Sequence, residues 1–125
     1  RPMHNQAANA YARVARAVAN PRELEARALL KASAMLQTIH DKGPETGPEL
    51  LEALVFNRRL WTIFASGAAD ETNGMDPGLR AEVTSLAAFV LSRTIDIEVE
   101  PTREAIASII GINRNIAAGL MGSAG

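Results

Sequence analysis

A helical period of apolar residues, interrupted by proline- and glycine-rich breaks, is the feature that most constrains this chain. The segments between the breaks are long enough for helices, and at about 100° per residue their apolar residues gather on one side. One segment, "TIDIEVE" at 94–100, alternates like a strand, and we interpret it as a helix end followed by an extended connector. We therefore expect an all-α protein. The breaks are "NP" (20–21), "KGPETGP" (42–48), "NGMDPG" (73–78) and "EPT" (100–102).

Helix start signals agree with this division of the chain. "NPRE" places Asn20 as an N-cap and Pro21 at the first helical position, and Asp76 and Pro77 repeat the pattern in "DPGL". We expect one domain, residues 1–125, folded as a bundle of four main helices plus an N-terminal helix, with residues 1–5 and 122–125 disordered. The expected helices cover about 6–18, 21–41, 48–66, 77–95 and 102–121.

The segment at about 48–66 differs from the others because its apolar residues spread around most of the helical circumference. A helix that is apolar nearly all round is usually buried. We therefore expect it to be the central helix, surrounded by the others. The sole tryptophan, Trp61, is expected in the core, although interfaces also favour this residue type. The apolar residues are Leu50, Leu51, Leu54, Val55, Phe56, Leu60, Trp61, Ile63 and Phe64.

Two adjacent arginines interrupt this apolar segment in "FNRRLW". On the helical wheel Arg58 falls inside the apolar arc, whereas Arg59 falls on the narrow polar side. A buried guanidinium needs a charged partner, because an unpaired buried charge is strongly destabilising. Glu25 falls within the apolar arc of the first long helix. We therefore predict an ion pair between Glu25 and Arg58.

Asn57 and Asn113 also fall among apolar neighbours. Buried amides usually bond backbone groups at helix ends or one another. Two interpretations of these polar residues stay open. They fix the register of the helices, or Arg58, Arg59 and Arg114 border a groove for a partner.

Composition and motifs favour a binding protein over an enzyme. The formal net charge is −1, so no basic excess attracts nucleic acid, and no cysteine is present for disulfides or thiolate metal sites. His4 and His40 are not at ligand spacing, and no P-loop or Ser-His-Asp candidate is present. We expect no catalytic residue, no cofactor and no bound metal.

The sequence also favours a cytoplasmic protein without membrane contact. No apolar run approaches the ~18 residues of a membrane span, and the N-terminus lacks the apolar block of a signal peptide. The absence of cysteine fits a reducing compartment. The oligomeric state is left open.

A combination of segments along nearly the whole chain points to a family. These segments are "NAYARVA" (9–15), "NPRELEARAL" (20–29), "FNRRLWTIFA" (56–65), "NGMDPGLRAEVTSLAAFV" (73–90) and "INRNIAAGL" (112–120). In this order they resemble the FlaF family of bacterial flagellar biosynthesis regulators from alphaproteobacteria. The resemblance implies a small helical cytoplasmic protein, not an enzyme, that is needed for flagellin production and export and acts with the translational regulator FlbT.

The same resemblance implies that the protein binds flagellin before secretion, as a chaperone or assembly factor. The alternative is a post-transcriptional regulator that acts through FlbT or flagellin messenger RNA. A chaperone role is physically reasonable, because a helical bundle can offer a groove to an amphipathic segment. The expected partner-binding residues are Tyr11, Val14 and Val18 of the N-terminal helix, Arg114 and Leu120 of the final helix, and Arg59.

Overall fold

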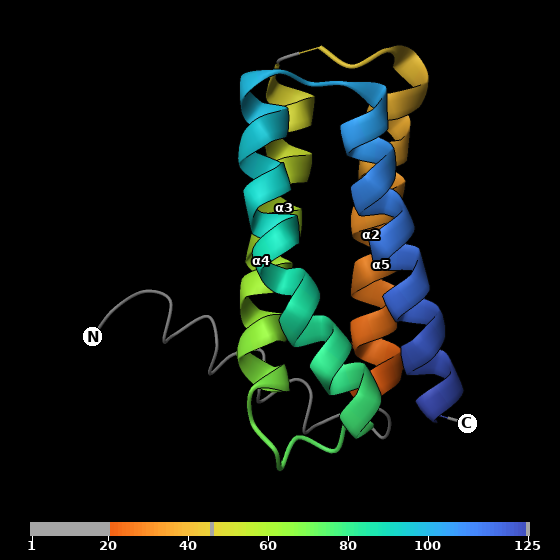
Figure 1. The fold of residues 1–125 in the computed structure, drawn as a ribbon. Helices are drawn as coiled ribbons and strands as arrows, with labels where there is room; N and C mark the ends of the chain where they lie inside the picture. The colour runs from red at the N-terminus through yellow and green to blue at the C-terminus, as the bar shows by residue number, and fades with distance from the viewer. Residues whose placement is uncertain (1–20, 46, 125) are drawn as a thin grey trace.

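Four helices make up the part of the chain that the computed structural model describes, residues 21–45 and 47–124, and no strand occurs there. They run alternately up and down the molecule (Figure 1). The predicted all-α bundle of four main helices is confirmed, whereas the N-terminal helix expected at about 6–18 lies outside the described residues. The helices are α2 (Pro21–Lys42), α3 (Pro48–Ala68), α4 (Pro77–Val99) and α5 (Arg103–Ala124).

The helix boundaries follow the sequence signals where proline and glycine set them. Helix α2 is followed by Gly43, whose φ of 102° lies in the left-handed region that glycine adopts without strain. Helix α4 has Asp76 as its N-cap, and the Asp76 carboxylate accepts a hydrogen bond from the backbone N–H of Leu79 at 3.2 Å. The predicted start of α4 is therefore confirmed.

Helices α4 and α5 both extend further toward the C-terminus than the sequence predicts. Helix α4 continues to Val99, so the interpretation of 94–100 as an extended connector is wrong. Thr94 and Ile97 are buried at helical spacing from Val90, and this inner face decides the conformation. Helix α5 continues to Ala124, so residues 122–124, for which we expected disorder, belong to it.

The helices form a ring in which each helix packs on two neighbours. Helix α2 packs on α3 and α5, and α4 packs on the same two helices, with the most extensive contact between α2 and α5. The prediction that the 48–66 segment is a central helix is therefore wrong. Helix α3 occupies one corner of the ring, and 55% of the surface of Leu51 on its outer side is exposed.

The core consists of two apolar clusters, one toward each end of the bundle. The cluster near the α3–α4 loop includes Trp61 and Phe64, whose rings meet edge to face at 5.7 Å. The other cluster lies near the α2–α3 and α4–α5 loops and includes Leu54 and Ile97. Trp61 is fully buried, which confirms its predicted place in the core.

A layer of polar residues separates the two clusters. Each helix contributes one buried polar residue to it, and each of these residues stands in its helix between members of the two clusters. Asn57, for example, lies between Leu54 of one cluster and Trp61 of the other. The layer residues are Ser33, Asn57, Thr94 and Asn113.

The amides of this layer bond one another, which is one of the two arrangements that the sequence left open. Asn113 donates from Nδ2 to Oδ1 of Asn57 at 2.8 Å, and its own Oδ1 accepts from Nε1 of Trp61 at 2.8 Å. Helices α3 and α5 are not neighbours in the ring, so this amide pair joins opposite corners across the core.

The two hydroxyls of the layer donate to backbone carbonyls. Ser33 donates to the carbonyl of Ile110 on α5 at 3.4 Å, and Thr94 donates to the carbonyl of Val90 in its own helix at 2.8 Å. The first bond therefore joins two helices, whereas the second is local to α4.

Helix α5 is the one described helix whose length and composition would allow it to cross a membrane, over Arg103–Gly122. A core helix of a soluble protein meets the same criterion. In this fold Ile106, Ile109 and Ile116 of α5 are buried within the two clusters.

Candidate partner-binding groove

A surface groove of about 470 Å³ runs between the outer sides of α2 and α3. We call it the α2/α3 groove. It lies beside the N-terminal half of α3, where Pro48 starts the helix. Its lining consists of Lys31, Met35, Pro48, Leu51, Glu52, Val55, Phe56 and Arg59.

The apolar part of this lining is accessible rather than buried in the core. Leu51 is exposed, and Met35, Val55 and Phe56 are half-buried. A short row of accessible apolar side chains between two helices is the surface that an amphipathic helix uses when it binds in a groove. This part of the molecule can therefore shield an apolar stripe of a partner.

Charged side chains border the α2/α3 groove on both walls. The ammonium of Lys31 on α2 lies 5.2 Å from the centroid of the Phe56 ring on α3, a cation–π contact. Arg59 and Glu52 are exposed on α3. Within the described residues Lys31 and Arg59 form no ion pair.

A second hollow, of about 390 Å³, lies on the other side of α3 and is lined by Gly47, Leu50, Leu51, Leu54 and Glu98. Leu51 lines both hollows and so forms a ridge between them. Leu51 is therefore accessible from both sides of α3.

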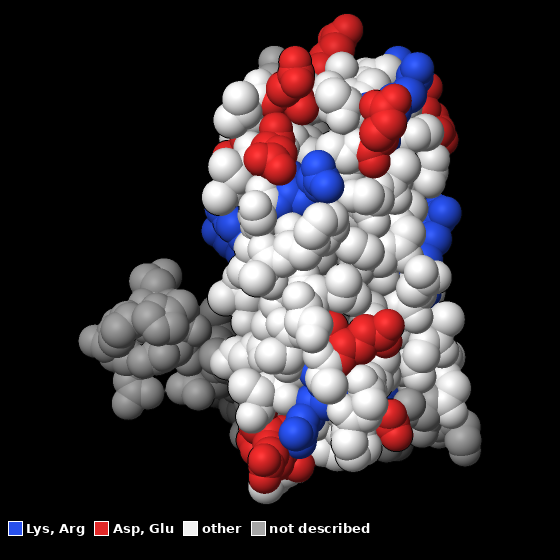
Figure 2. Space-filling model, viewed as in Figure 1, with Lys and Arg blue, Asp and Glu red and all other residues white. Residues whose placement is uncertain are grey.

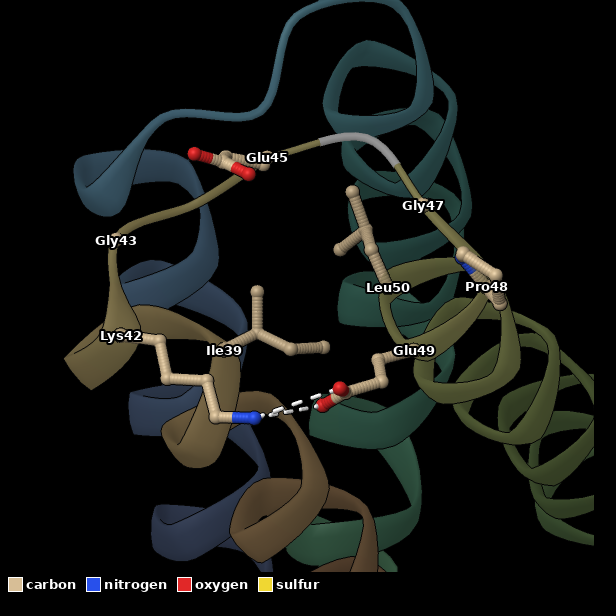
Figure 3. A pocket seen from close by; sticks show the side chains of 8 residues that line it. All are labelled: Ile39, Lys42, Gly43, Glu45, Gly47, Pro48, Glu49 and Leu50. Atoms are coloured by element: carbon tan, nitrogen blue, oxygen red, sulfur yellow. Dashed lines mark hydrogen bonds and ion pairs between the residues drawn. The ribbon is translucent and has the colours of Figure 1, made fainter.

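A third hollow, of about 310 Å³, lies at the α2–α3 loop (Figure 3). Lys42 at the end of α2 and Glu49 at the start of α3 point toward one another, and Nζ of Lys42 lies 3.4 Å and 3.1 Å from the two carboxylate oxygens. Arg103 also donates from Nε to the backbone carbonyl of His40 at 3.0 Å. These contacts tie the C-terminal end of α2 to the first turns of α3 and α5.

The predicted partner-binding residues fall in different places. Arg59 lies in the α2/α3 groove. Arg114 is exposed and donates to Oε1 of Gln37 at 3.2 Å, on the side where α2 meets α5. The expectation of Leu120 as an accessible anchor is wrong, because Leu120 is fully buried in the core. Tyr11, Val14 and Val18 lie outside the described residues.

The predicted Glu25–Arg58 ion pair is also wrong. Glu25 is buried and pairs with Arg22, at 3.0 Å between Nε and Oε1. The side chain of Arg58 is 48% exposed and pairs with Glu98 of α4 at 3.5 Å. Arg58 lies on the edge of α3 that faces α4, whereas Glu25 lies on α2, which packs on the other side of α3.

Of the groove lining, sequence reasoning named only Arg59. The residues that it missed are Lys31, Met35, Pro48, Leu51, Glu52, Val55 and Phe56. The signal was present in the spread of apolar residues around α3. That spread has two explanations, a helix buried on every side or a helix with an accessible apolar outer face, and the ring arrangement selects the second.

Comparison with known proteins gives one result that decides the family. The model of the family described as flagellar protein FlaF matches residues 7–120. The chain belongs to the FlaF family. No curated protein and no solved structure gives a significant match. As a member of the FlaF family the chain is a flagellar protein, and the match spans all of the α2/α3 groove.

Proposed function

We propose that this FlaF family member binds flagellin in the cytoplasm as a secretion chaperone or assembly factor, and so promotes flagellin synthesis and export. The observation that carries the proposal is the accessible apolar groove between α2 and α3 on a chain of a flagellar family. The adjoining hollow on the other side of α3 shares Leu51 with this groove, so the two together expose the N-terminal half of α3.

The physical basis is the shielding of an amphipathic segment before assembly. A flagellin terminal segment that is helical would place its apolar stripe against Leu51, Val55 and Phe56, which are accessible without disturbing the core. A few apolar anchors with charged side chains on the rim are typical of such interfaces. Binding in this mode covers the apolar stripe and keeps the segment soluble.

Direct contact with flagellin messenger RNA has less support. On the face in Figure 2, Lys and Arg side chains are scattered among Asp and Glu and form no continuous basic area. The net charge of −1 gives little of the electrostatic attraction on which RNA binding depends. We therefore propose that any effect on translation passes through a protein partner such as FlbT.

The test is a binding experiment with purified flagellin monomers and no RNA. Size-exclusion chromatography with light scattering, together with calorimetry, should show a soluble complex with full-length flagellin. Flagellin that lacks both terminal segments should not bind. Equal binding of the truncated flagellin would contradict helix-in-groove shielding, and RNA binding that weakens steeply with salt would support direct regulation instead.

A further inference from the structure

We infer that the α2/α3 groove selects an amphipathic helix with carboxylates beside its apolar stripe, at the end of the groove where Lys31 and Arg59 lie. The identity of the occupant as a flagellin segment rests on the proposed function. The inference adds the chemistry of the polar flank that this occupant must carry.

The first observation is that the groove holds two cations that form no ion pair within the described residues, although Glu52 also lines it. Lys31 comes from α2 and Arg59 from α3, and within the described residues neither forms an ion pair. Other exposed cations of the described surface do form ion pairs, as Arg27 does with Glu23 and Lys42 with Glu49. The groove thus keeps two cations available for an occupant.

The second observation is the position of the Lys31 ammonium, 5.2 Å from the centroid of the Phe56 ring. Phe56 is one of the apolar side chains that an occupant would contact. The cation–π contact keeps the ammonium beside this ring while Lys31 stays exposed. An occupant that covers Phe56 therefore meets the charge of Lys31.

The third observation is that charge changes sign along α3. Glu52 lies one helical turn before Phe56, nearer Pro48, whereas Arg59 lies almost one turn after it. The lining is therefore acidic toward the head of α3 and basic toward the middle of the bundle. A carboxylate on the occupant is attracted at the Lys31 and Arg59 end and repelled at the Glu52 end.

A pair of synthetic amphipathic peptides tests the inference directly. Both carry the same leucine stripe, and the residues beside the stripe are Glu in one peptide and Lys in the other. The Glu peptide should bind about three- to thirtyfold more tightly at low salt, since each exposed ion pair adds a modest amount. The difference should shrink at high salt.

Two variants with the same change of charge locate the effect. Arg59→Glu should remove most of the preference for the Glu peptide, and Arg114→Glu, on the α2–α5 side of the bundle, should keep it. Both arginines are exposed, so circular dichroism should show the native helix content in both variants. Equal binding of the two peptides, or equal effects of the two variants, would overturn the inference.

The same variants with flagellin separate this inference from the proposed function. If flagellin binds the Arg59→Glu variant as tightly as the unchanged protein, the carboxylate preference is wrong and the chaperone proposal stands. If flagellin does not bind at all while the Glu peptide binds in an Arg59-dependent way, the groove chemistry is right and the chaperone proposal is wrong.

Discussion

The side chains of Asn57 and Asn113 are hydrogen-bonded across the centre of the bundle, with Nδ2 of Asn113 donating to Oδ1 of Asn57 at 2.8 Å. They belong to α3 and α5, which lie at opposite corners of the ring and are not neighbours in it. Because Trp61 also donates to Asn113, the amide of Asn113 is bonded on both its nitrogen and its oxygen. Within the described residues, Nδ2 of Asn57 is buried without a hydrogen bond.

This asymmetry predicts unequal effects of removing the two amides. Asn113→Ala leaves Nε1 of Trp61 and Oδ1 of Asn57 buried without partners, and should lower the free energy of unfolding by about 2–4 kcal/mol. Asn57→Ala leaves only Nδ2 of Asn113 unpaired and also removes an unpaired donor, so about 1–2 kcal/mol is expected. Urea denaturation of both variants and of the double variant measures the two effects and their coupling.

Thr94→Val is the control within the same polar layer. The Thr94 hydroxyl bonds only a carbonyl of its own helix, so its loss should change the free energy of unfolding by less than about 1 kcal/mol. Equal losses in Asn57→Ala and Asn113→Ala, or additive effects in the double variant, would show that the amide bond does not couple α3 to α5.

Glu25 and Arg58 belong to separate ion pairs, so substitutions at these two residues should change the free energy of unfolding independently. Arg22, which pairs with Glu25, also donates to the backbone carbonyl of Asn73 at 3.3 Å and so ties α2 to the α3–α4 loop. Glu25→Ala should cost about 3 kcal/mol because the pair is buried, whereas the exposed Arg58→Ala should cost less than about 1 kcal/mol. A double-mutant cycle between Glu25 and Arg58 should be additive; a coupling above about 1 kcal/mol would contradict the structure.

Helix starts could be predicted from the sequence, whereas the partner of Arg58 could not. Pro21, Asp76 and Pro77 mark helix starts through backbone chemistry that is local to the chain, so a single sequence suffices to place them. The partner of Arg58 depends on which helix lies beside that edge of α3. A helical wheel gives the direction of a side chain within its own helix but not the order of helices around the ring.

Two glycines of α5 predict different changes in stability for the same substitution to alanine. An added Cβ at Gly111 meets no atom within 4 Å, so Gly111→Ala should stabilise the helix by about 1 kcal/mol. At Gly119 the added Cβ would lie 3.1 Å from Cδ1 of Leu79. Leu79 must shift, so Gly119→Ala should be at least about 1 kcal/mol less stable than Gly111→Ala. Thermal unfolding compares them, and equal gains would show that α4 and α5 are less closely packed at this point.

Asp70 in the α3–α4 loop gives a prediction on pH. The Thr72 hydroxyl donates to Oδ1 of Asp70 at 2.7 Å and the Thr72 backbone N–H donates at 2.9 Å, and these bonds lower the pKa of Asp70. A lowered pKa in the folded state stabilises the fold above the pKa of the unfolded chain, and this contribution is lost as pH falls through the folded pKa.

Thr72→Val should therefore raise the pKa of Asp70 while leaving it lowered in part by the remaining backbone bond. Carbon NMR titration of the Asp70 carboxyl measures the shift. Thr84→Val is the matched control, because its hydroxyl bonds the backbone carbonyl of Arg80 instead. An unchanged Asp70 pKa in Thr72→Val would show that the hydroxyl bond is not formed in solution.

The candidate groove illustrates a different limit of sequence reasoning. The exposed position of Arg59 agrees with its place on the polar side of the helical wheel, because the direction of a side chain within its own helix follows from the sequence alone. Leu51 and Val55 were expected to be buried on all sides of the helix. A sequence cannot distinguish an apolar residue covered by a neighbouring helix from one that a partner protein covers. The number of neighbours around α3 decides between these cases, and that number is a property of the assembled ring.

The most direct test of the central claim, that the α2/α3 groove binds flagellin, compares Leu51→Asp with Ile95→Asp. Both residues are exposed apolar side chains, Leu51 at 55% in the groove and Ile95 at 62% on α4, so each variant should keep the native circular dichroism spectrum. Calorimetry with monomeric flagellin should show an affinity at least about tenfold lower for Leu51→Asp and unchanged for Ile95→Asp. Unchanged affinity in Leu51→Asp, or an equal loss in both variants, would contradict the claim.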